Sequence, residues 1–164
     1  MRITRIDQAL ESCEDHLSSA SAFGTEIESL LTQSLLVLMC AEFEQKIEAI
    51  VQEKCSTILD PSIKGFVESC MSAVFRSTKS NEMAGLLNRF GSSYKEAFKK
   101  SANDDERVVT FYNNIVVNRH VVAHSEGSGI TFHDAKEFYE EGHVVLDFFQ
   151  DALLKSAEGK GTEG

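Results

Sequence analysis

The chain has 164 residues, of which 42% are hydrophobic and 26% charged, a balance typical of one soluble globular domain. Sixteen lysines and arginines stand against 26 aspartates and glutamates, so the formal net charge is −10. This charge argues against a protein that coats nucleic acid without sequence preference, because such proteins present a basic surface. It still allows a small local phosphate site.

The sequence contains no stretch that resembles a membrane span or a secretion signal. The longest apolar run, Leu35 to Ala41, is far shorter than the roughly 20 residues that a bilayer requires. The first residues lack an apolar signal core. None of the cysteines, Cys13, Cys40, Cys55 and Cys70, are paired at metal-ligand spacing. We therefore expect a cytoplasmic protein with buried free thiols.

Apolar residues recur with the period of a helix along the whole chain, and no alternating strand pattern stands out. The first predicted helix covers residues 2–23. The second covers 25–56, and Thr25 and Glu28 at its start have the spacing of a capping box. Because residues 30–50 are apolar on several faces, we predict that this helix lies at the centre of a bundle.

Cap residues mark the later helices. Asp60 before Pro61 starts one helix, Asn103 is expected to cap another, and Thr131 with Asp134 forms a second capping-box pattern. The predicted helices are 61–77, 80–90, 92–100, 103–125 and 131–156.

These elements predict a single all-α domain over residues 1–156, followed by a disordered tail over 157–164. The domain is expected to be a bundle of about five to seven helices. Two of its shorter helices precede the long helix 103–125, which carries the most unusual side chains.

Helix 103–125 is apolar over most of its surface but ends with two histidines and an arginine. Asn113, His120 and His124 share a narrow stripe, whereas Arg119 lies about 140° around the axis from His124. A single histidine on such a helix is usually a packing residue. Several polar groups close to one helix end instead favour an interface or a site, because an unpaired polar group is costly to bury.

The residue types at this helix end suit the cleavage of RNA. The negative end of the helix dipole favours an imidazolium at His124, which can then act as acid or base near neutral pH. Arg119 stays charged and can bind a phosphate with its forked guanidinium. A proton-transfer group and a fixed cation are what attack by an RNA 2′-hydroxyl on its own phosphodiester needs. We therefore predict Arg119 and His124 as catalytic residues, with His120 assisting.

The segment 118–125 resembles the R-x4-H motif of HEPN domains, which also lies late in a long penultimate helix. Residues 36–47 resemble the central helix of the RiboL-PSP-type and MAE-type HEPN group, in which an aromatic residue precedes a glutamate, here Glu44. Residues 129–149 resemble the closing helix of that group. The similarity covers residues 1–155.

This resemblance implies a HEPN-like bundle that forms a homodimer and brings two R-x4-H motifs into one cleft. It implies a metal-independent endoribonuclease of a toxin–antitoxin or antiphage-defence system. RNA would be the substrate, with an antitoxin or another operon-encoded protein as partner. The alternative is a non-catalytic HEPN module that binds a partner protein. The intact motif favours the enzyme, and the charge of −10 favours the module or a nuclease that reads a short RNA feature.

A metal site is the rival use of the two histidines. His120 and His124 have a spacing that can bind zinc, but the residues between them are apolar and no H-E-x-x-H glutamate is present. We therefore expect no metal and no cofactor. Glu44 either orients Arg119 or His120 or is an ordinary boundary residue of its helix, and the second interpretation is the more common one.

Further polar residues complete the candidate site. Asn113 is expected to support it by a hydrogen bond across the dimer or to RNA, and Asn118 is assigned a similar supporting role. Lys95, Lys99 and Lys100 form a basic cluster on a short predicted helix. This cluster can guide a phosphate backbone, although a solvated helix face is the simpler interpretation.

Overall fold

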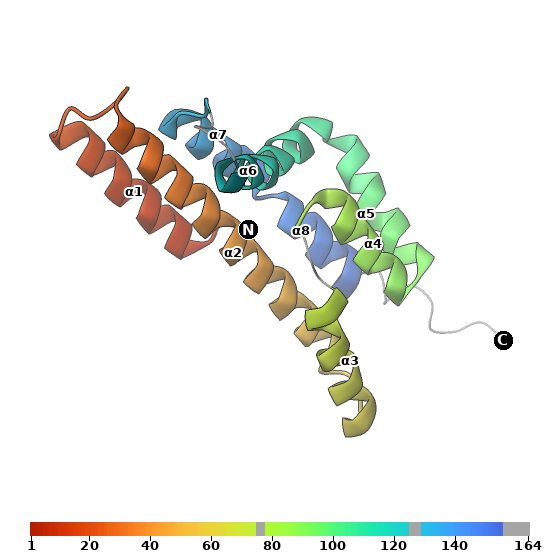
Figure 1. Cartoon of the computed structure of the whole chain (residues 1–164). Helices are drawn as coiled ribbons and strands as arrows, with labels where there is room; N and C mark the ends of the chain where they lie inside the picture. Colours follow the sequence, from red (N-terminus) through yellow and green to blue (C-terminus); the bar gives the residue numbers. More distant parts are fainter. Residues whose placement is uncertain (75–77, 125–128, 156–164) are drawn as a thin grey trace.

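Every regular element that the structure describes is a helix, which confirms the predicted all-α fold (Figure 1). The computed structural model describes residues 1–74, 78–124 and 129–155, with the backbone alone at 68, 70–74 and 120–124. Its helices are α1 (Thr4–Ser19), α2 (Glu26–Cys55), α3 (Pro61–Val74), α4 (Ser80–Phe90), α5 (Ser92–Asp104), α6 (Glu106–His124), α7 (Phe132–Gly142), α8 (Val145–Gln150) and the π-helical turn η1 (Asp151–Lys155). The predicted tail, 157–164, lies outside the described residues.

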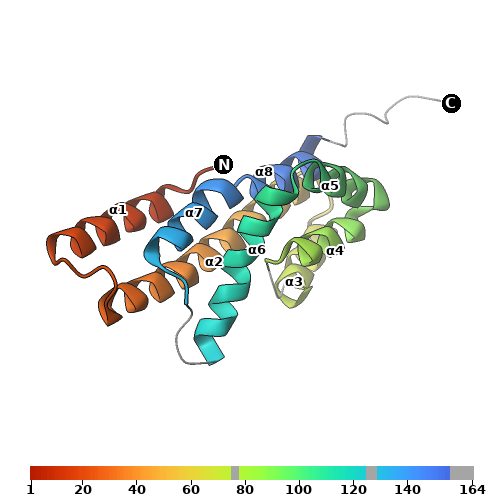
Figure 2. The same ribbon diagram turned by 90° about the horizontal axis from the view of Figure 1, so that it is seen from above.

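The long helix α2 is the axis of the bundle, as its apolar middle predicts. It contacts α1, α3, α6, α7 and α8. Figure 2 shows α1 and α7 beside its first half and α6 crossing it. Phe43, fully buried near the middle of α2, stacks on Tyr112 of α6 with ring centroids 5.1 Å apart and on Tyr139 of α7 at 6.4 Å. These three rings join the three helices that position the candidate site.

Two predicted caps are confirmed. Thr131 and Asp134 form a reciprocal capping box at the start of α7. The Asp60 carboxylate accepts the Ser62 backbone N–H at 2.8 Å, so it caps α3. In both places the cap side chain accepts a backbone N–H that is two or three residues away in sequence, so local spacing is enough to predict the contact.

Two other caps were predicted wrongly. Thr25 is the N-cap position of α2 as predicted, but its side chain makes no cap bond. The Glu28 carboxylate instead accepts the backbone N–H groups of Gly24 at 2.6 Å and Phe132 at 2.9 Å. Glu28 thus joins the start of α2 to the start of α7. Asn103 lies inside α5, and Asp105 caps α6 by accepting the Val108 N–H at 3.3 Å.

Several helix ends also differ from the prediction, and the helix predicted over 92–100 continues to Asp104. The first helix stops at Ser19 and not at residue 23, because the chain turns through positive φ at Ser21 and Gly24. The predicted helix 131–156 divides after Gly142 into α7 and α8 and ends in η1. Gly142 lies against α6 so closely that a Cβ atom there would be 2.5 Å from the backbone nitrogen of Tyr112. The backbones of α6 and α7 are therefore in direct contact.

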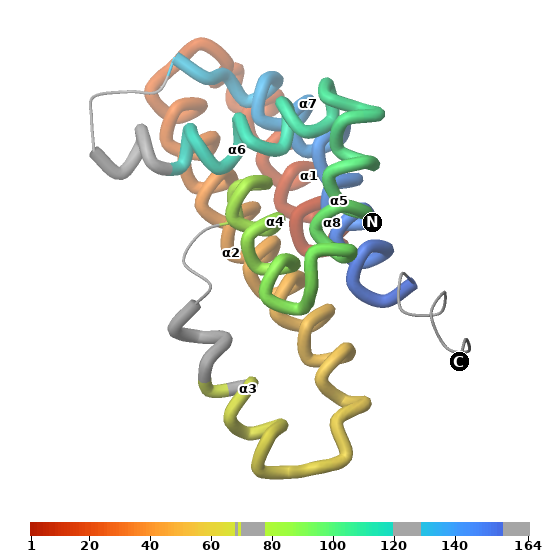
Figure 3. The backbone as a smooth tube through the Cα atoms, turned by 90° about the vertical axis from the view of Figure 1, so that its right-hand side faces the viewer, coloured from red at the N-terminus to blue at the C-terminus, as the bar shows by residue number. Residues whose placement is uncertain are grey.

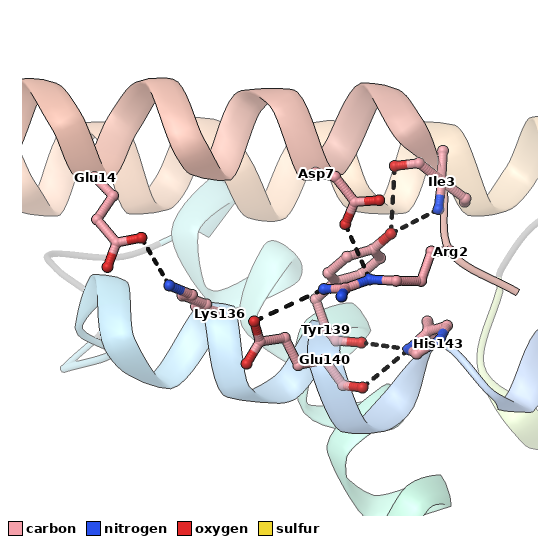
Figure 4. A network of polar contacts seen from close by, with 8 residues as sticks. All are labelled: Arg2, Ile3, Asp7, Glu14, Lys136, Tyr139, Glu140 and His143. Atoms are coloured by element: carbon pink, nitrogen blue, oxygen red, sulfur yellow. Dashed lines mark hydrogen bonds and ion pairs between the residues drawn. The ribbon is translucent and has the colours of Figure 1, made fainter.

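Polar contacts hold the N-terminal segment and α1 against α7 (Figure 4). The buried Tyr139 hydroxyl accepts the Ile3 backbone N–H at 2.7 Å, and burial raises the pKa of this tyrosine. Lys136 donates to Glu14 at 2.7 Å, and Arg2 lies 3.7 Å from Glu140. These contacts join the N-terminal segment and α1 to α7 and involve no residue of α4, α5 or α6.

Helix α3 extends away from the bundle beside the end of α2 (Figure 3). It exposes Ile63 at 53% and Phe66 at 68%, next to Leu59 at 97%. Cys40 and Cys55 are buried and Cys13 is half-buried, whereas the Cys70 side chain lies outside the described residues. Within the described ranges, no helix combines the length and the apolar character that crossing a membrane requires.

Candidate functional site

The candidate site lies where α6 crosses α2. Val108, Tyr112 and Ile115 form the buried face of α6, because they recur at helical spacing. Arg119 continues this face by one further turn, to the point where the core reaches the surface. Its side chain is 37% exposed. The helix periodicity thus places a permanent charge at the rim of an apolar core.

Glu44 of α2 is the ion-pair partner of Arg119. Atom Nη1 of Arg119 lies 3.6 Å from Oε1 of Glu44, and both side chains are 37% exposed. The structure therefore brings together two of the residues that the sequence singled out. A half-exposed pair of this kind contributes about 0–1 kcal/mol, so its main effect is on where the guanidinium points. Most of the five N–H groups of Arg119 are left for another anion.

Two side chains that the sequence analysis did not assign to the site lie beneath this pair. Burial raises the pKa of the Cys40 thiol to about 12, an effect that the Arg119 charge reduces and the Glu44 charge increases. Burial also raises the pKa of Tyr112, and the charges of Cys40 and Glu44 act in the same direction. Both groups are therefore neutral at pH 7 and do not serve as nucleophile or base there.

Helical spacing could have identified these two neighbours. Cys40 precedes Glu44 by four residues on α2, and Tyr112 precedes Arg119 by seven on α6. Both spacings place the earlier residue on the same helix face as the later one. What the sequence alone lacks is the contact between α2 and α6 that brings the two faces together.

Asn113 is engaged inside the chain. Its carbonyl oxygen accepts the Ser80 backbone N–H at 3.1 Å, and its amide donates to the Ser80 hydroxyl at 2.9 Å. This double contact fixes the start of α4 against α6. Asn118 donates to the backbone carbonyl of Asn114 at 2.8 Å, one turn earlier in its own helix. Each of these asparagines, assigned a supporting role, therefore already has a partner within the monomer.

The two histidines of the predicted site lie at the end of α6. The helix extends to His124, but the side chains of His120 and His124 lie outside the described residues. Their roles remain predictions. Among the side chains that are described, no three His, Cys, Asp or Glu residues gather as metal ligands would. The lysine cluster on α5 has Lys95 half-buried and Lys99 and Lys100 exposed.

Comparison with known families agrees with this architecture. The family model described as RiboL-PSP-HEPN matches residues 1–155. No curated protein and no solved structure matches the chain. The matched range includes α2 with Glu44, α6 with the R-x4-H sequence, and the closing helices. The chain therefore belongs to the RiboL-PSP-type HEPN family.

Proposed function

We propose that this chain is a cytoplasmic, metal-independent endoribonuclease that acts as a homodimer, in the manner of a toxin or an antiphage-defence effector. The observation that carries the proposal is the position of Arg119. It lies at the rim of the core beside Glu44, within an R-x4-H sequence of a HEPN-family chain. HEPN domains include nucleases and interaction modules, and an oriented arginine in an intact motif favours a nuclease.

The proposed reaction needs only side-chain chemistry. A base, assigned to His124, takes the proton from the RNA 2′-hydroxyl, and the 2′-oxygen forms a bond to the adjacent phosphorus. The bond from phosphorus to the 5′-oxygen breaks, and that oxygen receives a proton from an acid, assigned to His124 of the second copy or to His120. The products are a 2′,3′-cyclic phosphate and a 5′-hydroxyl. Proton transfer of this kind contributes about 10²–10⁴-fold to the rate.

Arg119 would stabilise the charge that gathers on the phosphate oxygens in the transition state. Glu44 would hold the guanidinium in place from below without occupying its outer N–H groups. Since Cys40 and Tyr112 are neutral at pH 7, the only nearby negative charge among these side chains is Glu44 itself. The pair of Arg119 and Glu44 has no net charge, so its attraction for phosphate would come from the guanidinium N–H groups that Glu44 leaves unoccupied.

A second copy of the chain is part of the proposal. On a regular helix Arg119 and His124 point about 140° apart, so one copy presents them to one phosphate poorly. Two motifs facing each other would supply an arginine from one chain and a histidine from the other. Val117 on α6 is 44% exposed and Val37 on α2 is 48% exposed, which gives the neighbourhood of the site apolar surface to cover.

The test is cleavage of total cellular RNA in the presence of EDTA. The wild type is expected to cleave and to leave 2′,3′-cyclic phosphate ends, whereas Arg119→Ala and His124→Ala are expected to be inactive. His16→Ala is the matched control, because His16 is an exposed residue of α1. Equal activity of the wild type and His124→Ala would contradict the assigned site.

The interaction module is the second candidate. It is favoured by the net charge of −10 and by the apolar residues that α3 exposes, Ile63 and Phe66. Its partner would be a protein encoded nearby, such as an antitoxin. Absence of cleavage on any RNA, with no toxicity on expression, would select this function over the nuclease.

A further inference from the structure

A groove of about 380 Å³ lies between α4, α5 and α6, apart from the Arg119–Glu44 pair. Its floor is apolar and largely buried, with contributions from Ala84, Phe98 and Val109. Its volume is at the lower end of the range of pockets that hold small organic ligands, about 300–1,000 Å³. A flat, partly apolar group of the size of one nucleobase is a suitable occupant.

The rim of the groove presents donors and acceptors to such a group. Asn81 and Asn103 lie on opposite helices and are exposed, and neither side-chain amide makes a hydrogen bond within the described part of the chain. Each amide offers a donor next to an acceptor, the pattern that pairs with the edge of a base. Glu106 adds an acceptor for an exocyclic amine, and Lys99 adds a cation for phosphate.

The distribution of charge favours RNA at this side of the molecule. Residues 79–124 contain seven lysines and arginines and five aspartates and glutamates, a net charge of +2. The rest of the chain carries a net charge of −12, which gives the total of −10. A polyanion is therefore repelled by most of the protein and tolerated along α4, α5 and α6. The groove and Arg119 both lie on this segment.

The groove is also held at a fixed distance from the candidate site. Thr110 lines the groove and Arg119 follows it by nine residues on α6, which is about 14 Å along the helix axis. The double hydrogen bond between Asn113 and Ser80 fixes α4, the opposite wall, against the same helix. On a regular helix Thr110 and Arg119 also point about 180° apart, so a strand that contacts both places has to pass around α6. The separation of the two places along α6 is set without rearrangement of the bundle, and different nucleotides of one strand would occupy them.

We propose that this groove is a base-reading subsite, which binds one unpaired base of a single-stranded RNA a few nucleotides from the phosphate at Arg119. The proposal rests on the proposed nuclease function and gives it a source of specificity. It is also compatible with the net charge of −10, because a site for one base does not require a basic surface over the whole protein. A nuclease with this subsite would recognise a short single-stranded feature and would bind duplexes or bulk nucleic acid weakly.

The test compares the double variant Asn81→Ala/Asn103→Ala with Asn88→Ala, a matched change at an exposed asparagine of α4 that does not line the groove. Each is made in the full chain that also carries His124→Ala, and binding is measured by fluorescence anisotropy on short single-stranded RNAs that differ at one base. The parent and Asn88→Ala are expected to prefer one base. The double variant is expected to bind that RNA about tenfold more weakly and to lose the preference, because the hydrogen bonds to the base edge are gone.

Equal affinity and preference in all three proteins, or no binding of any single-stranded RNA by the parent, would overturn the subsite. Cleavage assays on the corresponding chains with His124 intact separate the two proposals. Cleavage whose base preference survives in the double variant leaves the nuclease and removes the subsite. RNA binding that the double variant loses, from a wild type that cleaves nothing, leaves the subsite and removes the nuclease.

Discussion

At the scale of single residues, the site is defined by a charge placed where an apolar helix face reaches the surface. Arg119 occupies a position that the helix period of α6 reserves for core residues, and it is tolerated there because Glu44 lies 3.6 Å away and solvent reaches both groups. The environment beneath it keeps Cys40 and Tyr112 uncharged. The chemistry is thus concentrated on the guanidinium and on the histidines that follow it.

The first prediction concerns the shape of the cation. Arg119→Lys is expected to reduce RNA cleavage by at least about 100-fold, because a point charge does not replace the planar fork that binds two phosphate oxygens. The free energy of unfolding should change by less than about 1 kcal/mol, since the pair with Glu44 is half-exposed. Initial cleavage rates and urea denaturation measure the two effects. A lysine variant with the wild-type rate would show that charge alone is sufficient.

The second prediction concerns alkaline pH. The pKa of Cys40 is raised from 9.0 to about 12 in the folded chain, so the folded state keeps a proton that the unfolded state loses. Stability from this group is complete below pH 9 and is lost as the pH rises towards 12. Denaturation midpoints measured from pH 8 upward should therefore fall, and Cys40→Ala should make the fall less steep. An identical pH dependence in the variant would contradict the buried thiol.

At the scale of elements, one residue of α6 holds the start of α4 through two hydrogen bonds. Ser80 begins α4, and both its backbone N–H and its hydroxyl bond to Asn113 of α6. The opposite side of the bundle is held by different contacts, those between the N-terminal segment and α7. We therefore expect the two sides to respond separately to substitution.

The third prediction is that Asn113→Ala releases α4 locally. Losing two hydrogen bonds at a mostly buried serine is expected to cost about 1–3 kcal/mol. Amide hydrogen exchange should quicken in residues 80–90 and remain unchanged in α1 and α7. Asn88→Ala serves as the control, because that side chain is exposed and lies on α4 itself. Faster exchange in α1 as well would show that the sides are coupled.

How far the sequence predicts these elements depends on where each partner lies. The Thr131–Asp134 cap is local, and it was predicted correctly. Thr25 and Glu28 have the same spacing, yet Glu28 binds the backbone of Phe132, 104 residues away. In the site, the sequence leaves open whether Glu44 orients Arg119 or is an ordinary boundary residue, and the fold places the two groups 3.6 Å apart. A tertiary contact replaces a local one at Glu28, and at Arg119 the partner lies on another helix that the sequence does not place.

At the scale of the whole molecule, the acidic charge lies in the residues outside 79–124, and the proposed site needs two copies of that segment. Like charges on the remaining surfaces oppose random association, so a dimer has to form through a surface that is apolar and poor in acidic residues. Val117 is an exposed apolar residue within residues 79–124, which carry a net charge of +2, so we expect the dimer to form there.

The fourth prediction is that dimerisation and cleavage are lost together. Sedimentation of the wild type at micromolar concentration is expected to show a dimer, and Val117→Glu is expected to be a folded monomer without activity. The valine is 44% exposed, so the charge does not enter the core. Phe66→Glu, at an exposed position of α3, should stay dimeric and active. A monomeric wild type that cleaves RNA would refute the paired site.

The contact between Gly142 and the backbone of Tyr112 has a consequence for the timescale of motion. Because no side chain separates the two backbones, α6 and α7 have no compliant layer through which to slide. Slow, collective opening of the bundle would have to separate α6 from α7 in one step. The backbone amides of both helices should therefore be among the last to exchange. Faster motions that admit a ligand would occur in α4, which forms one wall of the groove and is held to α6 by side-chain hydrogen bonds. The helix that carries Arg119 would then be the stationary reference against which a bound strand is positioned.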